Sequence, residues 1–303
     1  MQRRVFLTIG ICLVTLSCRE PKTRTPQKDP GPEPIAKLTQ AAPNLEAVQK
    51  LLGEGKYDDA LSAVDRELTA HPDHPKLLFF QGFAYFNLKK YEAALASFGK
   101  VRKTGVVSLE LTISLSETLF YLQKYDECEK VLREGMQKFP KAAALWYNLG
   151  GIYAEKKDLE NAKKMYAEAL LREPDFGPAL YSLGDLHASE KAYDKALEML
   201  NKLVAQEKYK EIAHAKLAIV LSYQKKWEEA LVHVGELEKI NAASGKLLRD
   251  KIRVSQAFGE LGELIRSKKC KDAKARLETI RKEFPGAPAL PKAQELLTRD
   301  CPR

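Results

Sequence analysis

Apolar residues recur along most of the chain on the short period of amphipathic α-helices, and a longer period of 34 residues is superimposed on them. The longer period is clearest in small residues, which stand where a helix must approach its neighbour closely. These residues are Ala60, Ala94, Cys128, Ala162, Ala196 and Ala230. A fixed period of this length predicts a repeated pair of helices and an all-α fold.

Each period also contains the features of a helix hairpin. Three residues before each small residue stands a large side chain, which we expect to fill the space near the turn between the two helices. These side chains are Tyr57, Tyr91, Tyr125, Leu159, Tyr193 and Trp227. Pro72, Pro140, Pro174 and Pro285 are expected to end second helices, because proline cannot continue a helix. A single hairpin buries little apolar surface, so neighbouring hairpins must stack into one core.

The register divides the repeats into six contiguous units over residues 41–244 and a seventh, displaced unit within residues 245–303. Cys270 and Ala273 match the large and small positions of that seventh unit, but Ala273 follows Ala230 by 43 residues instead of 34. We attribute the excess to longer helices around residues 240–255. The amphipathic stretch 288–299 is then expected to be the capping helix that solenoids need.

The clearest unit reads Trp146-x2-Leu149-Gly150-x2-Tyr153, followed by Ala162-x3-Tyr166 and Pro174. This pattern resembles the signature of tetratricopeptide repeats (TPRs), with Tyr166 in place of the usual phenylalanine. The resemblance extends over roughly residues 41–300. It implies a right-handed superhelical solenoid of about seven TPR hairpins with a C-terminal capping helix.

The first 18 residues have the pattern of an export signal. Arg3 and Arg4 precede an apolar run over residues 5–16, which is too short to span a bilayer as a helix. The run ends at Ser17-Cys18, which resembles a bacterial lipoprotein signal with Thr15 where leucine is usual. The resemblance implies that residues 1–17 are a signal peptide and that Cys18 is lipidated; a plain secretory signal is the alternative. Arg19 follows the cysteine, which by the same resemblance favours the outer membrane, facing the periplasm.

Residues 18–40 are expected to form a tether. Prolines alternate with charged and polar residues there, and almost no side chain could join a core. Such a segment reaches roughly 25 Å as a flexible coil and up to about 70 Å as polyproline II helix. The folded repeats could therefore stand clear of a membrane surface.

Composition and motifs exclude several function classes. The net charge of +9 is small for 303 residues, so we expect no nucleic-acid partner. Phosphate-binding loops, zinc-protease motifs and nucleophile elbows are absent from the sequence, so we expect neither an enzyme nor a cofactor. His71 and His74 share one turn without further ligands, and the remaining histidines, His187, His214 and His233, are expected on separate repeats. We therefore predict no metal site.

The TPR resemblance implies that one face of each first helix lines a concave groove. Aromatic side chains recur at those positions, as in grooves that bind a peptide or a helix. The candidate partner-binding residues are Phe83, Phe120, Tyr121, Tyr147, Tyr181 and Tyr223. Phe79, Phe86, Ile113 and Glu117 belong to the same positions, and of these Phe79 or Phe86 is expected to pack in the core. The alternative is that some of the candidate rings also pack between the first helices.

A second periodic feature is basic. Lysines recur at each turn between paired helices, and stacking would place them along one edge, here named the lysine ridge. Its members are Lys56, Lys89, Lys90, Lys124, Lys156, Lys157, Lys191, Lys225, Lys226, Lys268 and Lys269. The ridge is either a solvated edge that maintains solubility or a surface that attracts anionic glycan or lipid.

The cysteines suit an oxidising compartment. Cys12 would leave with the signal peptide, and Cys128 occupies a core position as a buried thiol. If the capping helix runs antiparallel to the last repeat helix, Cys270 and Cys301 come close together. We predict a disulfide between them.

Two hypotheses of function remain. The first is a non-enzymatic scaffold anchored in the bacterial envelope, which binds an envelope protein in its aromatic groove. It resembles TPR lipoproteins of pilus secretin, outer-membrane or peptidoglycan machinery. The second is an envelope structural protein that binds glycan or lipid through the lysine ridge. Ridge binding should weaken steeply with salt, whereas groove binding should hardly change.

Overall fold

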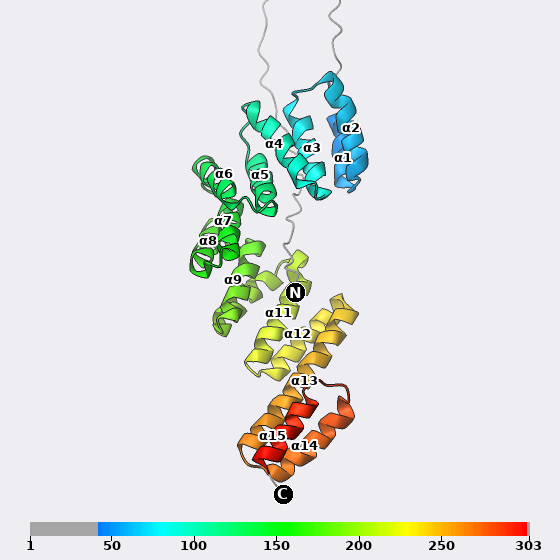
Figure 1. The fold of residues 1–303 in the computed structure, drawn as a ribbon, viewed down its shortest axis with the longest axis vertical. Helices are drawn as coiled ribbons and strands as arrows, with labels where there is room; N and C mark the ends of the chain where they lie inside the picture. Colours follow the sequence, from blue (N-terminus) through cyan, green and yellow to red (C-terminus); the bar gives the residue numbers. More distant parts are fainter. Residues whose placement is uncertain (1–41, 302–303) are drawn as a thin grey trace, which may run out of the picture. The chain divides into compact units, whose positions relative to one another are not determined.

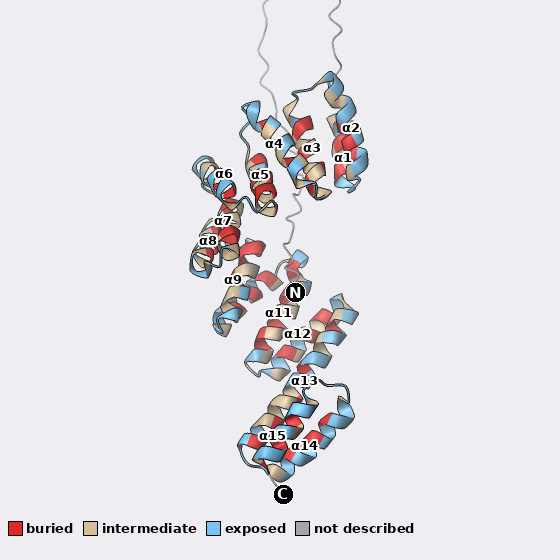
Figure 2. Ribbon diagram, viewed as in Figure 1, coloured by how far each residue is buried: buried red, intermediate tan, exposed pale blue. Residues whose placement is uncertain are grey.

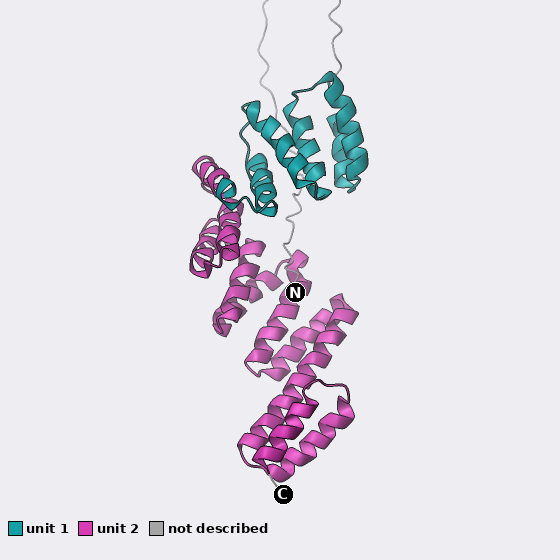
Figure 3. Ribbon diagram, viewed as in Figure 1, with its two compact units in different colours: residues 1–128 teal, residues 129–303 magenta. Residues whose placement is uncertain are grey.

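The computed structural model describes residues 42–301, and all regular secondary structure in this range is helical (Figure 1). The prediction of an all-α fold built from helix hairpins is confirmed. No helix within these residues is both long and apolar enough to cross a bilayer. The predicted signal peptide and tether lie outside the described residues. The chain divides into two compact units, residues 1–128 and 129–303, which are described in turn (Figure 3).

The first unit is built from stacked antiparallel helix pairs. Helix α1 packs on α2 and α3 on α4; α2 contacts α3, and α4 contacts α5. The first helices of successive pairs also touch, since α3 contacts both α1 and α5. The bounds are α1 Leu45–Gly53, α2 Tyr57–Ala70, α3 Pro75–Asn87, α4 Tyr91–Lys103 and α5 Leu109–Tyr121, with α6 Tyr125–Lys138 crossing into the second unit.

The second unit continues the same scheme. Helices α7 and α8, α9 and α10, α11 and α12, and α13 and α14 form pairs, and each second helix contacts the next first helix. The bounds are α7 Ala143–Glu155, α8 Leu159–Arg172, α9 Gly177–Ser189, α10 Tyr193–Val204, the short η1 Glu207–Tyr209, α11 Lys210–Tyr223, α12 Trp227–Ile240, α13 Ala242–Arg266, α14 Cys270–Glu283 and α15 Leu290–Asp300. The second helices therefore begin at the large residues that the sequence marks.

The 34-residue period is a period of burial. Figure 2 shows buried residues on the faces that paired helices turn toward each other. The small residues Ala60, Ala94, Ala162, Ala196, Ala230 and Ala273 are 0% exposed, and Cys128 is 1% exposed. Small side chains at these points let two helix backbones approach, and larger neighbours fill the remaining space.

Two glycines show how closely the paired helices approach. A Cβ atom added to Gly82 would lie 2.6 Å from the ring of Phe98, and one added to Gly150 would lie 2.6 Å from the ring of Tyr166. Both rings are buried and belong to the second helix of the same hairpin. Each glycine thus provides the space that an aromatic residue fills.

The turns between paired helices place lysines in an unusual backbone conformation. Lys89, Lys157, Lys191, Lys225 and Lys268 have φ between 55° and 65°, as does Gln123 at 58°. At these turns a backbone hydrogen bond that spans the positive-φ residue closes the end of the helix. One example is the hydrogen bond from the Asp158 N–H to the Tyr153 carbonyl, at 2.9 Å. Glycine takes this conformation without a Cβ clash, whereas lysine takes it at a cost.

Replacing Lys157 with glycine is therefore expected to raise the free energy of unfolding by about 1 kcal/mol, because the left-handed conformation no longer strains a Cβ. Urea unfolding followed by circular dichroism measures the change. Lys157→Ala is the matched control, since it removes the charge but keeps the Cβ, and it should leave stability almost unchanged. Equal stabilisation by both substitutions would show that charge, not backbone strain, is responsible.

The C-terminal end departs from the period as the sequence predicts. Helix α13 is 25 residues long, which accounts for the displaced seventh hairpin. Helix α15 packs against α13 and α14 and buries Ala293 and Leu297 in their shared core. Cys270, the first residue of α14, forms a disulfide with Cys301, which ends α15. This is the pairing that the sequence analysis expects.

Candidate partner-binding surface

The candidate aromatic residues of the first unit lie on α3 and α5 and are held by other rings. The ring of Tyr121 stacks on Tyr91, with 4.8 Å between centroids and 3° between planes, and meets Phe86 edge-on at 5.5 Å. Phe120 meets Tyr125 edge-on at 5.6 Å. Stacked and edge-to-face pairs of this kind fix ring positions. The aromatic surface of this unit is therefore preorganised.

Burial sets only Phe86 apart from the candidate residues of the first unit. Phe86 is 8% exposed and belongs to the core, as expected for one of the two residues singled out. Phe79 is partly buried and packs against Phe98 at 5.6 Å. Phe83 is partly buried and packs against the core between α1, α2 and α3, so less of its ring is available to a partner than in a fully exposed side chain. Phe120 and Tyr121 are partly buried as well.

The second unit holds the other three candidates, on α7, α9 and α11. The ring of Tyr147 packs against Tyr166 and Phe176, with centroids at 5.4 and 5.7 Å. Tyr223, at 61% exposed, is far more accessible, and its ring centroid lies 6.1 Å from that of Tyr193. The alternative that some candidate rings pack within the fold thus applies to Tyr147, whereas Tyr223 offers most of its ring to solvent.

Tyr181 lies in a polar cluster between α9 and α11. The ammonium group of Lys216 lies 5.3 Å from the centre of the Tyr181 ring and forms an ion pair with Asp185. Burial lowers the pKa of Lys216, but the Asp185 carboxylate and Tyr181 outweigh it and hold the pKa above its usual value. Lys216 is therefore a fixed positive charge on this face.

A charged side chain on α5 is the main feature that the aromatic pattern alone does not reveal. Glu117 is partly buried, and burial raises the pKa of its carboxyl group to about 7. Ile113, Phe120 and Tyr121 are one helical turn away, on the same face of α5. The signal in the sequence is a lone carboxylate with large, mainly apolar residues at three of the four positions one helical turn away.

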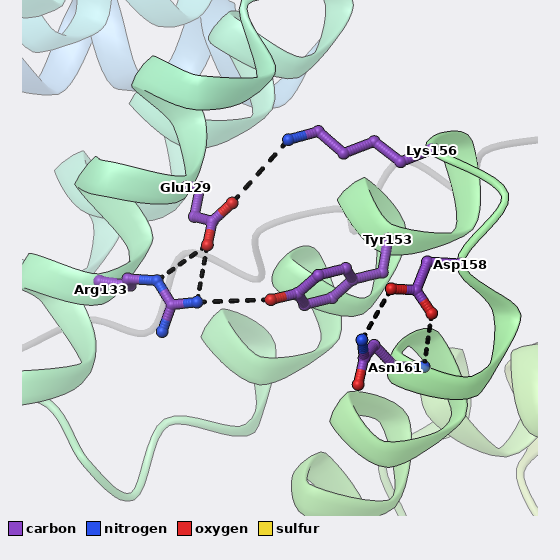
Figure 4. A network of polar contacts seen from close by, with 6 residues as sticks. All are labelled: Glu129, Arg133, Tyr153, Lys156, Asp158 and Asn161. Atoms are coloured by element: carbon purple, nitrogen blue, oxygen red, sulfur yellow. Dashed lines mark hydrogen bonds and ion pairs between the residues drawn. The ribbon is translucent and has the colours of Figure 1, made fainter.

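A polar network links α6 to α7 within the second unit (Figure 4). Arg133 donates to Glu129 through Nε at 2.9 Å and Nη2 at 2.6 Å, and Nη2 also donates to the Tyr153 hydroxyl at 3.3 Å. Lys156 reaches Glu129 at 4.0 Å. The signature residue Tyr153 thus supports the packing of adjacent hairpins.

Ion pairs neutralise part of the lysine ridge. Lys56 pairs with Glu54 at 2.8 Å, Lys124 with Glu127 at 3.3 Å and Lys225 with Glu263 at 2.6 Å. These acidic partners reduce the positive potential that an anionic surface would meet.

The expectation that the last three histidines occupy separate repeats is wrong. His214 on α11 and His233 on α12 belong to one hairpin, and their Nδ1 atoms lie 3.0 Å apart. One ring donates to the other, and burial lowers the pKa of both. Within residues 42–301 no group of three or more metal-binding side chains comes together.

Two cysteines singled out in the sequence remain, Cys128 and Cys18, and only Cys128 lies within the described residues. Cys128 is buried, and its thiol donates a hydrogen bond to the Ser116 carbonyl at 3.0 Å. The lipidation candidate Cys18 lies outside the described residues.

Sequence comparisons find repeat proteins. The profile described as "Anaphase-promoting complex, cyclosome, subunit 3" matches residues 53–135, and the profile "Tetratricopeptide repeat" matches residues 119–186. Tetratricopeptide repeat protein 8 of Caenorhabditis elegans is 27% identical over 135 residues, which are 44% of this chain. The match spans only 26% of that relative's length.

Structural comparisons find the same fold at low identity. The C-terminal part of a TPR repeat-containing protein from Cytophaga hutchinsonii has a TM-score of 0.62 and 13% identity, covering 82% of this chain and 99% of that one. PilF of Pseudomonas aeruginosa has a TM-score of 0.57 and 14% identity, covering 69% and 94%. A chain of the APC/C hetero-tetramer Cut9–Hcn1 has a TM-score of 0.56 and 18% identity, covering 69% and 42%. Stacked hairpins with a 34-residue core period and these profile matches together identify the chain as a tetratricopeptide repeat protein.

Proposed function

We propose that the chain is a non-enzymatic scaffold that binds a peptide or helix of a partner protein on the aromatic face of its first helices. The fold supports binding in general, because TPR proteins bind partner proteins. The observation that carries the more specific proposal is Tyr223, a large aromatic side chain that is 61% exposed on α11. Tyrosine is enriched among the interface residues that contribute most to binding energy.

We further propose that the scaffold acts in a bacterial envelope, anchored through a lipid on Cys18, and helps to assemble or localise an envelope complex. Three features support this location. They are the basic and apolar pattern of residues 1–17, the proline-rich segment 18–40, and the disulfide between Cys270 and Cys301, which suits an oxidising compartment. Radiolabelled palmitate incorporated by the wild type and lost in Cys18→Ala would support the anchor; equal labelling of both would contradict it.

The groove proposal is tested by cross-linking in intact membranes followed by mass spectrometry. The double variant Tyr181→Ala, Tyr223→Ala is expected to lose capture of a partner at least tenfold, because truncating one interface aromatic costs about 2 kcal/mol. Both rings are on first helices, and Tyr223 can be truncated with little effect on the core.

The matched control is Leu171→Ala, Val232→Ala. These side chains are 76% and 65% exposed, but they lie on the second helices α8 and α12. The control should capture the partner as the wild type does. Unchanged capture by the tyrosine variant, or equal loss in both variants, would contradict binding on the aromatic face.

A further inference from the structure

Glu117 on α5 is an ionisable side chain without a partner. It is partly buried, and no hydrogen bond or ion pair joins it to any residue in the described part of the chain. Two other partly buried charges in the described residues are paired, Lys216 with Asp185 and Arg249 with Glu238, the latter at 2.6 Å. Glu117 is therefore an exception that calls for a physical explanation.

Three of the four neighbours of Glu117 on its own face of α5 are large and mainly apolar, and the fourth, Ser114, is buried with no hydrogen-bond partner for its hydroxyl within the described residues. Ile113 precedes it by one turn, and Phe120 and Tyr121 follow it by one turn, so all three share its helix face. Tyr121 is held by the stack on Tyr91 and the edge contact with Phe86. Desolvation by burial alone accounts for the raised pKa of the Glu117 carboxyl group.

An unpaired carboxylate in such a place lowers the stability of the free protein. Groups of this kind are concentrated at functional sites, where a ligand supplies the missing interaction. A cationic group would form a charge-assisted hydrogen bond with the carboxylate and could also lie against the faces of the neighbouring rings. An anionic or purely apolar group would leave the carboxylate unpaired and more deeply buried.

We propose that Glu117 forms a subsite that receives a lysine or arginine side chain of the bound peptide. The subsite comprises Glu117 with Ile113, Phe120 and Tyr121 on α5. The inference rests on the proposed function, because it assumes that a peptide binds on the first helices. It adds that this part of the surface selects a basic side chain of that peptide.

The test selects a random dodecapeptide library, displayed on phage, against the purified full chain. Peptides selected by the wild type are expected to contain a lysine or arginine at one preferred position. Selection against Glu117→Gln should lose that preference, since the amide keeps the shape of the side chain but not its charge. Glu92→Gln, an exposed carboxylate on the second helix α4, is the matched control and should keep the preference.

A double-mutant cycle then measures the contact directly. One selected peptide is synthesised with its basic residue and with the neutral counterpart, norleucine for lysine or citrulline for arginine. Removing the charge should weaken binding to the wild type roughly 10- to 100-fold, as for a charge-assisted hydrogen bond, and should hardly affect binding to Glu117→Gln. Circular dichroism checks that the variant keeps its helicity.

The outcomes separate this inference from the proposed function. Two outcomes overturn the subsite but leave peptide binding intact. Either the selected peptides have no preferred basic residue, or removing the peptide's charge weakens binding equally for the wild type and Glu117→Gln. Failure to select any peptide overturns both.

Discussion

Removing the C-terminal disulfide by Cys270→Ala, Cys301→Ala is expected to lower the free energy of unfolding of the last three helices by about 3.5 kcal/mol. The bridge joins the first residue of α14 to the residue that ends α15, across 31 positions. Without it the unfolded chain gains the conformational entropy of an open loop. Helix α15 has only 11 residues, which is too short for stability alone, so it depends on its packing against α13 and α14.

Hydrogen exchange across α13–α15 in increasing urea measures this loss locally, where whole-chain unfolding would average over the repeats. Reductant should destabilise the wild-type segment by the same amount and should leave the double variant unchanged. If reductant has no effect on exchange in the wild type, the disulfide does not stabilise this end of the solenoid.

Glu117→Gln is expected to stabilise the protein at neutral and alkaline pH, by up to about 3 kcal/mol at pH 9. The folded-state pKa is about 7, above the ordinary value of 4.5. Below pH 4.5 the carboxyl is protonated in both the folded and the unfolded chain, so the variant and the wild type should be equally stable. Between pH 4.5 and 7 the unfolded chain ionises first, and the wild type progressively loses stability. Above pH 7 the difference is constant.

Urea unfolding at several pH values, read by hydrogen exchange at α5, measures the difference. Glu92→Gln should show no such pH-dependent gain, because that carboxylate is exposed. A gain that is independent of pH would mean that side-chain packing, and not the buried charge, is responsible. If Glu117 is kept for function, its replacement by glutamine should make the protein more stable and at the same time weaken peptide binding.

Much of the fold can be predicted from the sequence because each hairpin is specified locally. The residues that begin the second helices, such as Tyr57 and Trp227, mark those starts correctly, and the length of α13 follows from the displaced Ala273. Repeats contact mainly their neighbours, so a pattern in one stretch of sequence determines most of the contacts there. The cysteine pairing follows from the same argument, because two adjacent antiparallel helices bring their opposite ends together.

The binding surface is less predictable. Helical spacing places Phe83, Tyr147 and Tyr223 on comparable faces, yet Phe83 packs against a core, Tyr147 packs against Tyr166 and Phe176, and Tyr223 is 61% exposed. How far a ring is buried depends on the side chains of the next hairpin, which vary between repeats. The same limit applies to His214 and His233, whose contact depends on how two particular helices meet.

The sequence by itself determined the helix hairpins, their period and their small and aromatic core positions, because these depend on interactions within about one repeat. Only the tertiary structure decided which surface residues have partners. It paired Lys216 with Asp185, placed Lys157 in a left-handed turn, and left Glu117 unpaired among mainly apolar neighbours. The physical reason is that pairing and desolvation depend on distances of a few ångströms between side chains of different helices, which a pattern along the chain does not specify.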